Sequence, residues 1–320
     1  MKNSRLFIPG ITIVMVLLCA GLFSHYGKVS ATPRTVTTDD VVLTSVSAPN
    51  AAHLAAQFTQ YNYDWPPSAT TTVPLLEVAT LPGDLNDQIV AVKKSIFFRA
   101  MLPLILAENH RIEMKYRWIE EQFANGDVLP GTTEWGALHQ IAGSYRVKGD
   151  INDISVRREL LRRVDSLPVA MVLAQAAQES GWGTSRFAQE GNSLFGEWTF
   201  RKGAGITPGE RLEGKSHTVR AFPNLRASVR SYMHNINISR AYRELRVMRA
   251  EMRSTGKPFN AYTLASGLKR YSERGELYVR DIRTIIKGNS LDSLGEIRMI
   301  SGGGGEKPWM AVPVVSPGTV

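Results

Sequence analysis

The chain has 320 residues, of which 43% are hydrophobic, and its 38 Lys and Arg against 29 Asp and Glu give a net charge of +9. This length suggests one or two domains with a sizeable core. The single cysteine, Cys19, excludes a disulfide framework, and neither it nor the six scattered histidines have metal-ligand spacing, so we expect no metal and no cofactor. The basic charge is compatible with an anionic partner. No nucleic-acid-binding signature accompanies it, so we expect the protein not to bind nucleic acid.

The first apolar segment lies at the N-terminus. Lys2 and Arg5 precede residues 6–23, a stretch without charge that is near the minimum for a membrane span and long for a signal-peptide core. We favour a signal anchor within residues 1–26, while a signal-peptidase-like site at residues 29–31 leaves cleavage open. Both interpretations predict that the body of the chain is exported.

The next segments differ in composition. Residues 27–82 are rich in Thr, Ser, Ala, Val and Pro, which predicts an extended and mostly unstructured tether. Residues 83–139 predict a helical extension, because apolar side chains from Ile105 to Phe123 recur at helical spacing. Pro103 should kink or split this helix.

Residues 140–288 form the predicted main domain. The run LPVAMVLAQAAQE, residues 167–179, is apolar almost all round, which is typical of a buried central helix, and Gly181 can end it. Residues 183–223 lack helical periodicity and predict a small hairpin, with one strand in 214–222 and its partner in 205–212. Further helices are predicted at 134–146, 153–164, 225–252, 260–270 and 276–287, and residues 289–320 predict a flexible tail.

A carboxylate ends the apolar central helix. The negative end of the helix dipole and burial against Trp182 should both raise the pKa of Glu179, as a glycosidase general acid requires. The Gly-Trp-Gly turn and the segment from Asn192 to Trp198 would then line a groove, with Trp182, Phe195 and Trp198 stacking on sugar rings. The alternative is a solvated Glu179 in the last helical turn with Trp182 in the core.

The same stretch carries a resemblance to a known family. Residues 178–198, QESGWGTSRFAQEGNSLFGEW, resemble the signature of bacterial peptidoglycan glucosaminidases of the lysozyme-like superfamily, glycoside hydrolase family 73-like proteins. Residues 219–242 resemble the segment after that family's hairpin, and residues 268–286 its closing tyrosine-containing helix. Residues 93–123 resemble the upstream region of the Bax-type branch, membrane-associated proteins of Gram-negative bacteria. This resemblance implies that the exported body of the chain lies in the periplasm, either anchored in the inner membrane or released.

The resemblance implies a fold and an activity. The fold would be mainly α, a lysozyme-like α+β domain with a small β-hairpin lobe. Glu179 would be the general acid that cleaves the β-1,4 bond after N-acetylglucosamine in peptidoglycan. Tyr271 and Tyr278 would bind the acetamido group or stabilise the transition state, unless they are core residues at helical spacing.

The second carboxylate is left open. Glu213 is preferred because it directly precedes the predicted strand, and Glu210 and Glu197 are alternatives. The second group would hold a water in an inverting enzyme, and no second acid is needed if the substrate's acetamido group attacks.

Other functions remain open at this point. An N-acetylmuramidase or lytic transglycosylase acting on the same polymer would share the helix-end glutamate, and a non-catalytic cell-wall binding module would not need it. The segment from Arg201 to Arg253 contains twelve Lys and Arg residues but only four Asp and Glu residues. Such a basic rim could bind the lactyl and peptide carboxylates of peptidoglycan.

Overall fold

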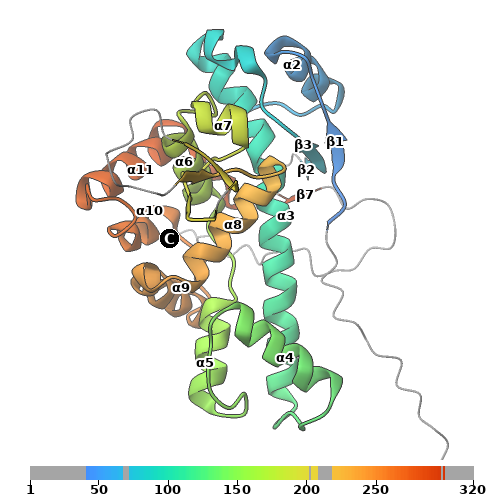
Figure 1. The fold of residues 1–320 in the computed structure, drawn as a ribbon, viewed down its shortest axis with the longest axis vertical. Helices are drawn as coiled ribbons and strands as arrows, with labels where there is room; N and C mark the ends of the chain where they lie inside the picture. The colour runs from blue at the N-terminus through green and yellow to red at the C-terminus, as the bar shows by residue number, and fades with distance from the viewer. Residues whose placement is uncertain (1–40, 68–71, 202, 208–217, 297, 300–320) are drawn as a thin grey trace, which may run out of the picture. The chain divides into compact units, whose positions relative to one another are not determined.

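Helices dominate the computed structural model of the chain, as the sequence predicts (Figure 1). The structure describes residues 41–67, 72–201, 203–207, 218–296 and 298–299. Within these ranges no helix combines the length and the apolar character needed to cross a membrane. Residues 6–23 and Cys19 lie outside the described ranges, so the anchor stays a prediction.

The elements follow a mainly helical order with short strands between them. The α-helices are α2 (Ala51–Gln60), α3 (Val90–Ala124), α4 (Thr133–Ser144), α5 (Ile154–Arg163), α6 (Val169–Ser180), α7 (Arg186–Gly191), α8 (Leu225–Ile238), α9 (Arg243–Ser254), α10 (Ala261–Leu264) and α11 (Glu276–Gly288). The 3-10 helices are η2 (Gly83–Asp87), η3 (Arg240–Tyr242), η4 (Ala265–Leu268) and η5 (Leu291–Glu296). The strands are β1 (Thr44–Val46), β2 (Thr72–Val73), β3 (Leu76–Val78), β4 (Trp198–Thr199), β5 (Gly205–Ile206), β6 (Thr218–Arg220) and β7 (Arg298–Met299).

The prediction of an unstructured tether over residues 27–82 is wrong for the part that the structure describes. β1 pairs in parallel with β3, and the side chain of Asn50 caps α2 by accepting a hydrogen bond from the His53 backbone N–H at 2.9 Å. Leu54 and Phe58 of α2 are fully buried in the main core. Strands of three residues are too short to show alternation, and their stability comes from packing on the rest of the core, which composition cannot reveal.

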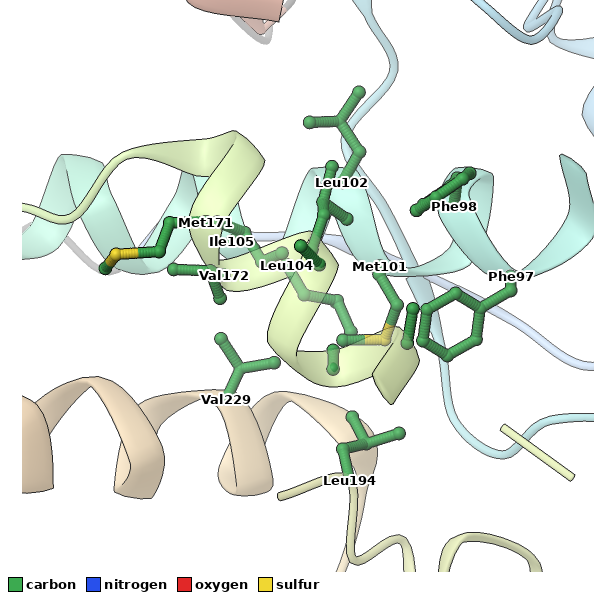
Figure 2. Packing of buried hydrophobic residues seen from close by; sticks show 14 of the residues in the cluster. Phe97, Phe98, Met101, Leu102, Leu104, Ile105, Met171, Val172, Leu194 and Val229 are labelled. Atoms are coloured by element: carbon green, nitrogen blue, oxygen red, sulfur yellow. The ribbon is translucent and has the colours of Figure 1, made fainter. Parts of the chain in front are cut away.

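Helix α3 does not form a separate extension, and it is not split at Pro103. Its first half packs on α6 and α8 in the main hydrophobic core, where Phe97, Met101, Val172 and Val229 meet (Figure 2). Pro103 is itself buried in this contact. A proline inside a helix costs about 3 kcal/mol, and this dense burial on both sides offsets that cost.

A second hydrophobic core joins the far end of α3 to α4 and α5. Ile119 of α3, Leu138 of α4 and Leu160 of α5 are fully buried there. The helices predicted at 134–146 and 153–164 are confirmed within two residues. The 35-residue helix α3 therefore contributes to both cores (Figure 1).

The central helix α6 is confirmed, and Gly181 ends it in a left-handed conformation with φ 57°. The predicted hairpin is confirmed, since β5 pairs antiparallel with β6. Strand β4, which we did not predict, pairs with the other edge of β6. The predicted helix 225–252 is divided at Ser239 into α8 and α9. The predicted tail also begins with helix η5, whose Leu291 is buried in the main core.

One glycine sets how closely the segment before α11 approaches α9. A Cβ on Gly267 of η4 would lie 2.6 Å from the Cα of Leu245. The two backbones are therefore in direct contact, and this contact holds the segment after η4 against the start of α9. Tyr271 and Tyr242 lie on these two segments, and their ring centroids are 6.0 Å apart.

Candidate active site

The turn after α6 is built from left-handed residues. Gly181, Trp182 and Gly183 all have positive φ, at 57°, 61° and 79°. Ser180 fastens the turn, because its Oγ accepts a hydrogen bond from the Gly183 N–H at 2.8 Å. A Cβ on Gly183 would lie 2.3 Å from Leu81, so this turn requires glycine both for its backbone and for its packing.

Glu179 lies in the last turn of α6 and is half-buried. Desolvation by burial raises the pKa of its carboxyl group above the ordinary value of 4.5, and a hydrogen bond with Tyr278 opposes this rise. The predicted direction of the shift is therefore confirmed. A carboxyl group with a raised pKa keeps its proton closer to neutral pH, which a general acid requires.

Gln175 orients the hydroxyl that reaches Glu179. It lies one helical turn earlier on α6 and is fully buried. Its Nε2 donates to the Oη of Tyr278 at 2.9 Å, and its Oε1 accepts from the Oη of Tyr232. Because the amide nitrogen can only donate, the hydroxyl proton of Tyr278 is left for Glu179. Gln175 thus makes Tyr278 a donor toward the carboxylate.

Aromatic rings surround this hydrogen-bond chain. Phe195 stacks on Tyr232 with centroids 3.8 Å apart, and Tyr271 stacks on Tyr278 at 5.2 Å. The hydroxyl of Tyr271 donates to the backbone carbonyl of Phe195 at 3.0 Å. Burial raises the pKa of the Tyr242 hydroxyl to about 12, with smaller contributions from Glu179 and Glu197. The cluster keeps these tyrosines neutral and shields Glu179 from water.

Glu197 is the second acidic residue of the site. Burial raises its pKa, while a hydrogen bond from Ser231 and the charge of Arg220 lower it. Ser231 Oγ donates to Oε2 at 2.8 Å, and Arg220 Nη1 lies 3.8 Å from the same oxygen. The other oxygen, Oε1, is buried and has no hydrogen-bond partner among the described residues. The charges of Glu179 and Glu197 both contribute to raising the pKa of Tyr242.

Glu210 and Glu213, the other candidates for the second carboxylate, lie within residues 208–217, outside the described ranges. The preference for Glu213 therefore stays a prediction. Of these candidates, the structure places only Glu197.

The predicted sugar-stacking residues have different positions. Trp182 packs edge-on against Phe98 of α3, with centroids 5.2 Å apart, and Lys94 Nζ lies 4.5 Å from the centre of its ring. Trp182 is thus half-buried and joins the turn to α3, and its role in sugar stacking stays a prediction. Trp198 on β4 is 65% exposed, and Phe200 two residues later is 78% exposed. These two rings are the accessible aromatic surface of the sheet.

Asn192 has a backbone role in the structure. It ends α7 in a left-handed conformation, and its Nδ2 donates to the backbone carbonyl of Phe222 at 3.2 Å. Together with the hydrogen bond from the Leu194 N–H to Ser228 at 3.2 Å, this contact fixes the Leu-Phe-Gly segment against α8.

Sequence reasoning missed several residues of the site, namely Gln175, Phe200, Ser231, Tyr232 and Tyr242. One signal was available for Gln175, which is a polar residue inside an apolar run and lies four residues before Glu179, on the same helical face. Within the described part of the chain, no group of His, Cys, Asp or Glu has an arrangement that could hold a metal ion.

Comparisons with known proteins fit this arrangement. The family model for glucosaminidase, described as mannosyl-glycoprotein endo-beta-N-acetylglucosaminidase, matches residues 156–291. Protein bax of Escherichia coli (strain K12) is 34% identical over 187 residues, which cover 58% of this chain and 66% of the relative. The chain is therefore similar to Bax-type proteins, and residues 156–291 match a glucosaminidase domain. The aligned part is just under two thirds of the relative's length, and no solved structure matches significantly.

Proposed function

We propose that this chain is an exported glycosidase that cleaves the β-1,4 bond after N-acetylglucosamine in peptidoglycan. The observation that carries the proposal is the environment of Glu179. A half-buried carboxyl group with a raised pKa lies in a tyrosine cluster, at a turn whose residues match a glucosaminidase domain. A lysozyme-like arrangement of the helices around this site is part of the proposal.

In this mechanism Glu179 donates its proton to the leaving glycosidic oxygen. The Tyr278 hydroxyl then stabilises the carboxylate that forms, because a hydrogen bond to the charged form favours it. Desolvation has the opposite effect and keeps the acid protonated before the reaction. Trp198 and Phe200 would supply the exposed aromatic surface for sugar rings.

Glu197 is the candidate base among the described residues. Burial raises the pKa of Glu197, whereas the hydrogen bond from Ser231 and the charge of Arg220 favour the ionised form, and no described residue donates a hydrogen bond to Oε1. In an inverting reaction this carboxylate would take a proton from the attacking water. Glu213 remains the alternative base, and the acetamido group of the substrate remains the alternative nucleophile.

The test is digestion of purified peptidoglycan with the full chain, followed by mass spectrometry of the new ends. N-acetylglucosamine at the reducing ends supports the proposal. N-acetylmuramic acid ends would instead indicate a muramidase, and anhydro ends a transglycosylase. Glu179→Gln should abolish cleavage, while an unchanged rate in that variant would overturn the assignment of the acid.

The second group is tested by comparing Glu197→Ala with Glu213→Ala. Loss of cleavage that azide restores, with an azide product of inverted anomeric configuration, identifies the base. If these two variants and Glu210→Ala all cleave normally, the acetamido group of the substrate is the nucleophile.

Export is proposed on the apolar segment at residues 6–23. A fusion of residues 1–40 to a reporter that is active only outside the cytoplasm should be active, and resistance to alkaline extraction would distinguish an anchor from a cleaved signal.

A further inference from the structure

A basic cleft lies between α5 and the segment that joins α8 to α9. It consists of two adjoining hollows, of about 410 Å³ and about 520 Å³. The two hollows share Glu159, Arg163 and Arg243. The first adds Arg146, Lys148 and Arg162, and the second adds Arg240, Arg246 and Arg270. We call these residues the arginine cleft.

Positive charge in the arginine cleft exceeds what the protein neutralises. Glu159 is the one carboxylate among the residues that line it, and that side chain is engaged by Arg163 at 2.6 Å and Arg162 at 3.0 Å. Arg240, Arg243 and Arg270 are exposed to solvent. Like charges held this close repel one another, so an anion in the cleft would relieve that repulsion.

The buried Arg246 adds to this excess of positive charge. The side chain is 2% exposed, and its Nη1 donates to the backbone carbonyls of Ile236 and Ser239. Its Nε is buried without a hydrogen-bond partner among the described residues. Burial, and then the nearby charges of Arg163 and Arg249, lower its pKa to about 10, so it still carries its charge at neutral pH.

The arginine cleft and the candidate active site draw residues from two common chain segments. Arg243 directly follows Tyr242, and Arg270 directly precedes Tyr271. The rings of these two tyrosines are 6.0 Å apart and belong to the cluster around Glu179. Each of the two segments therefore carries both a tyrosine of the Glu179 cluster and an arginine of the cleft.

The shape of the positive surface favours discrete anions. Glu159, paired with two arginines, lines both hollows and places a negative charge among the positive ones, whereas a nucleic acid presents closely spaced phosphates. The residues that line the two hollows include no aromatic side chain on which a base could stack. Separate carboxylates on flexible side groups fit this pattern better, since each can pair with an arginine.

We propose that the arginine cleft binds the carboxylate-bearing peptide stems of the peptidoglycan strand whose glycan lies at Glu179, an inference that rests on the proposed function. The cleft then selects glycan strands that still carry their peptides over strands from which the peptides have been removed.

Binding by full-length protein with Glu179→Gln tests this, because the substrate stays intact. The cleft variant carries Arg243→Gln and Arg270→Gln. A matched control carries Arg158→Gln and Arg280→Gln, which also removes two exposed charges but lies outside the residues that line the cleft. Each is measured on intact peptidoglycan and on glycan strands stripped of peptide by an amidase, at low and at physiological salt.

The cleft variant should bind intact peptidoglycan about tenfold more weakly than the control, with a smaller dependence on salt. On stripped strands the two should bind equally. Arg243→Lys with Arg270→Lys should recover much of the loss, which a folding defect would not allow. Equal binding of both variants to intact peptidoglycan would overturn the proposal.

Other outcomes also overturn the proposal. These are an equal loss on stripped strands, a loss seen only with a DNA oligonucleotide or with anionic vesicles, and no binding of the parent protein to intact peptidoglycan. Failure of the proposed function would look different, because the unmodified chain would then release no new reducing ends, whatever the variants bind.

Discussion

Replacing Tyr278 by phenylalanine removes the hydroxyl that stabilises the Glu179 carboxylate. The hydrogen bond lowers the pKa of Glu179, while burial, the larger effect, raises it. Removal of the hydroxyl leaves burial unopposed, so the pKa should rise further. A general acid must be protonated, and activity falls as pH rises through its pKa. The alkaline limb of the pH–rate profile should therefore move to higher pH.

The size of this shift follows from the kind of bond. A hydrogen bond to a charged group is worth about 1.5–3 kcal/mol, and 1.36 kcal/mol corresponds to one pKa unit, so the shift should be about 1–2 units. The substitution also leaves Nε2 of the fully buried Gln175 without its acceptor. That loss should lower the free energy of unfolding by about 1–3 kcal/mol.

The assay is a carbon-13 NMR titration of the Glu179 carboxyl group together with the pH dependence of peptidoglycan cleavage. Tyr271→Phe is the matched control, since that ring stacks on Tyr278 but its hydroxyl donates to the Phe195 carbonyl. The control should leave the titration of Glu179 in place. A pKa of Glu179 that is unchanged or lower in Tyr278→Phe would refute the reasoning.

Three further predictions concern stability and binding. Glu179→Gln should raise the thermal midpoint at pH 7. The pKa of the Glu179 carboxyl is higher in the folded state than in the unfolded state, so at any pH above the unfolded-state pKa this group destabilises the folded protein. The gain should disappear below about pH 4, and a gain that persists there would contradict this. Gly267→Ala should cost about 1–3 kcal/mol in urea unfolding, since its Cβ would meet the Leu245 backbone, and an unchanged midpoint would exclude that contact. Trp182→Ala should cost about 1–3 kcal/mol of stability because the side chain is half-buried against α3, whereas Trp198→Ala should weaken binding of glycan strands with little loss of stability. The reverse pattern would contradict their placement.

The sequence predicts the elements whose local signals are strong. The apolar run before Glu179 and the glycine after it identify a buried helix and its end, and from these the direction of the pKa shift at Glu179 follows. Trp182 could not be placed in this way. Its aromatic partners Phe97 and Phe98 lie about eighty residues earlier in the chain, and nothing local indicates that they meet.

The hydrogen-bond chain at the site could not be predicted from local sequence signals, for a related reason. Gln175, Tyr232 and Tyr278 come from α6, α8 and α11, and only tertiary packing brings their polar atoms together. Ser231 and Glu197 likewise come from α8 and from the chain beside β4. The segment before residue 82 was misjudged because its short strands and its ten-residue helix depend on long-range packing.

The position of α3 limits how this protein can be divided. The family match begins at residue 156, yet α3 ends at Ala124 and supplies part of the core against which α6 and α8 pack. A fragment cut at the start of the match would expose the apolar faces of these helices to water. Grafting that fragment into another protein would transfer the sequence of the site without the support that shapes it. The part of the chain that must fold as one unit is thus longer than the segment that matches the family. A recombination point within α3 would separate residues that must fold together.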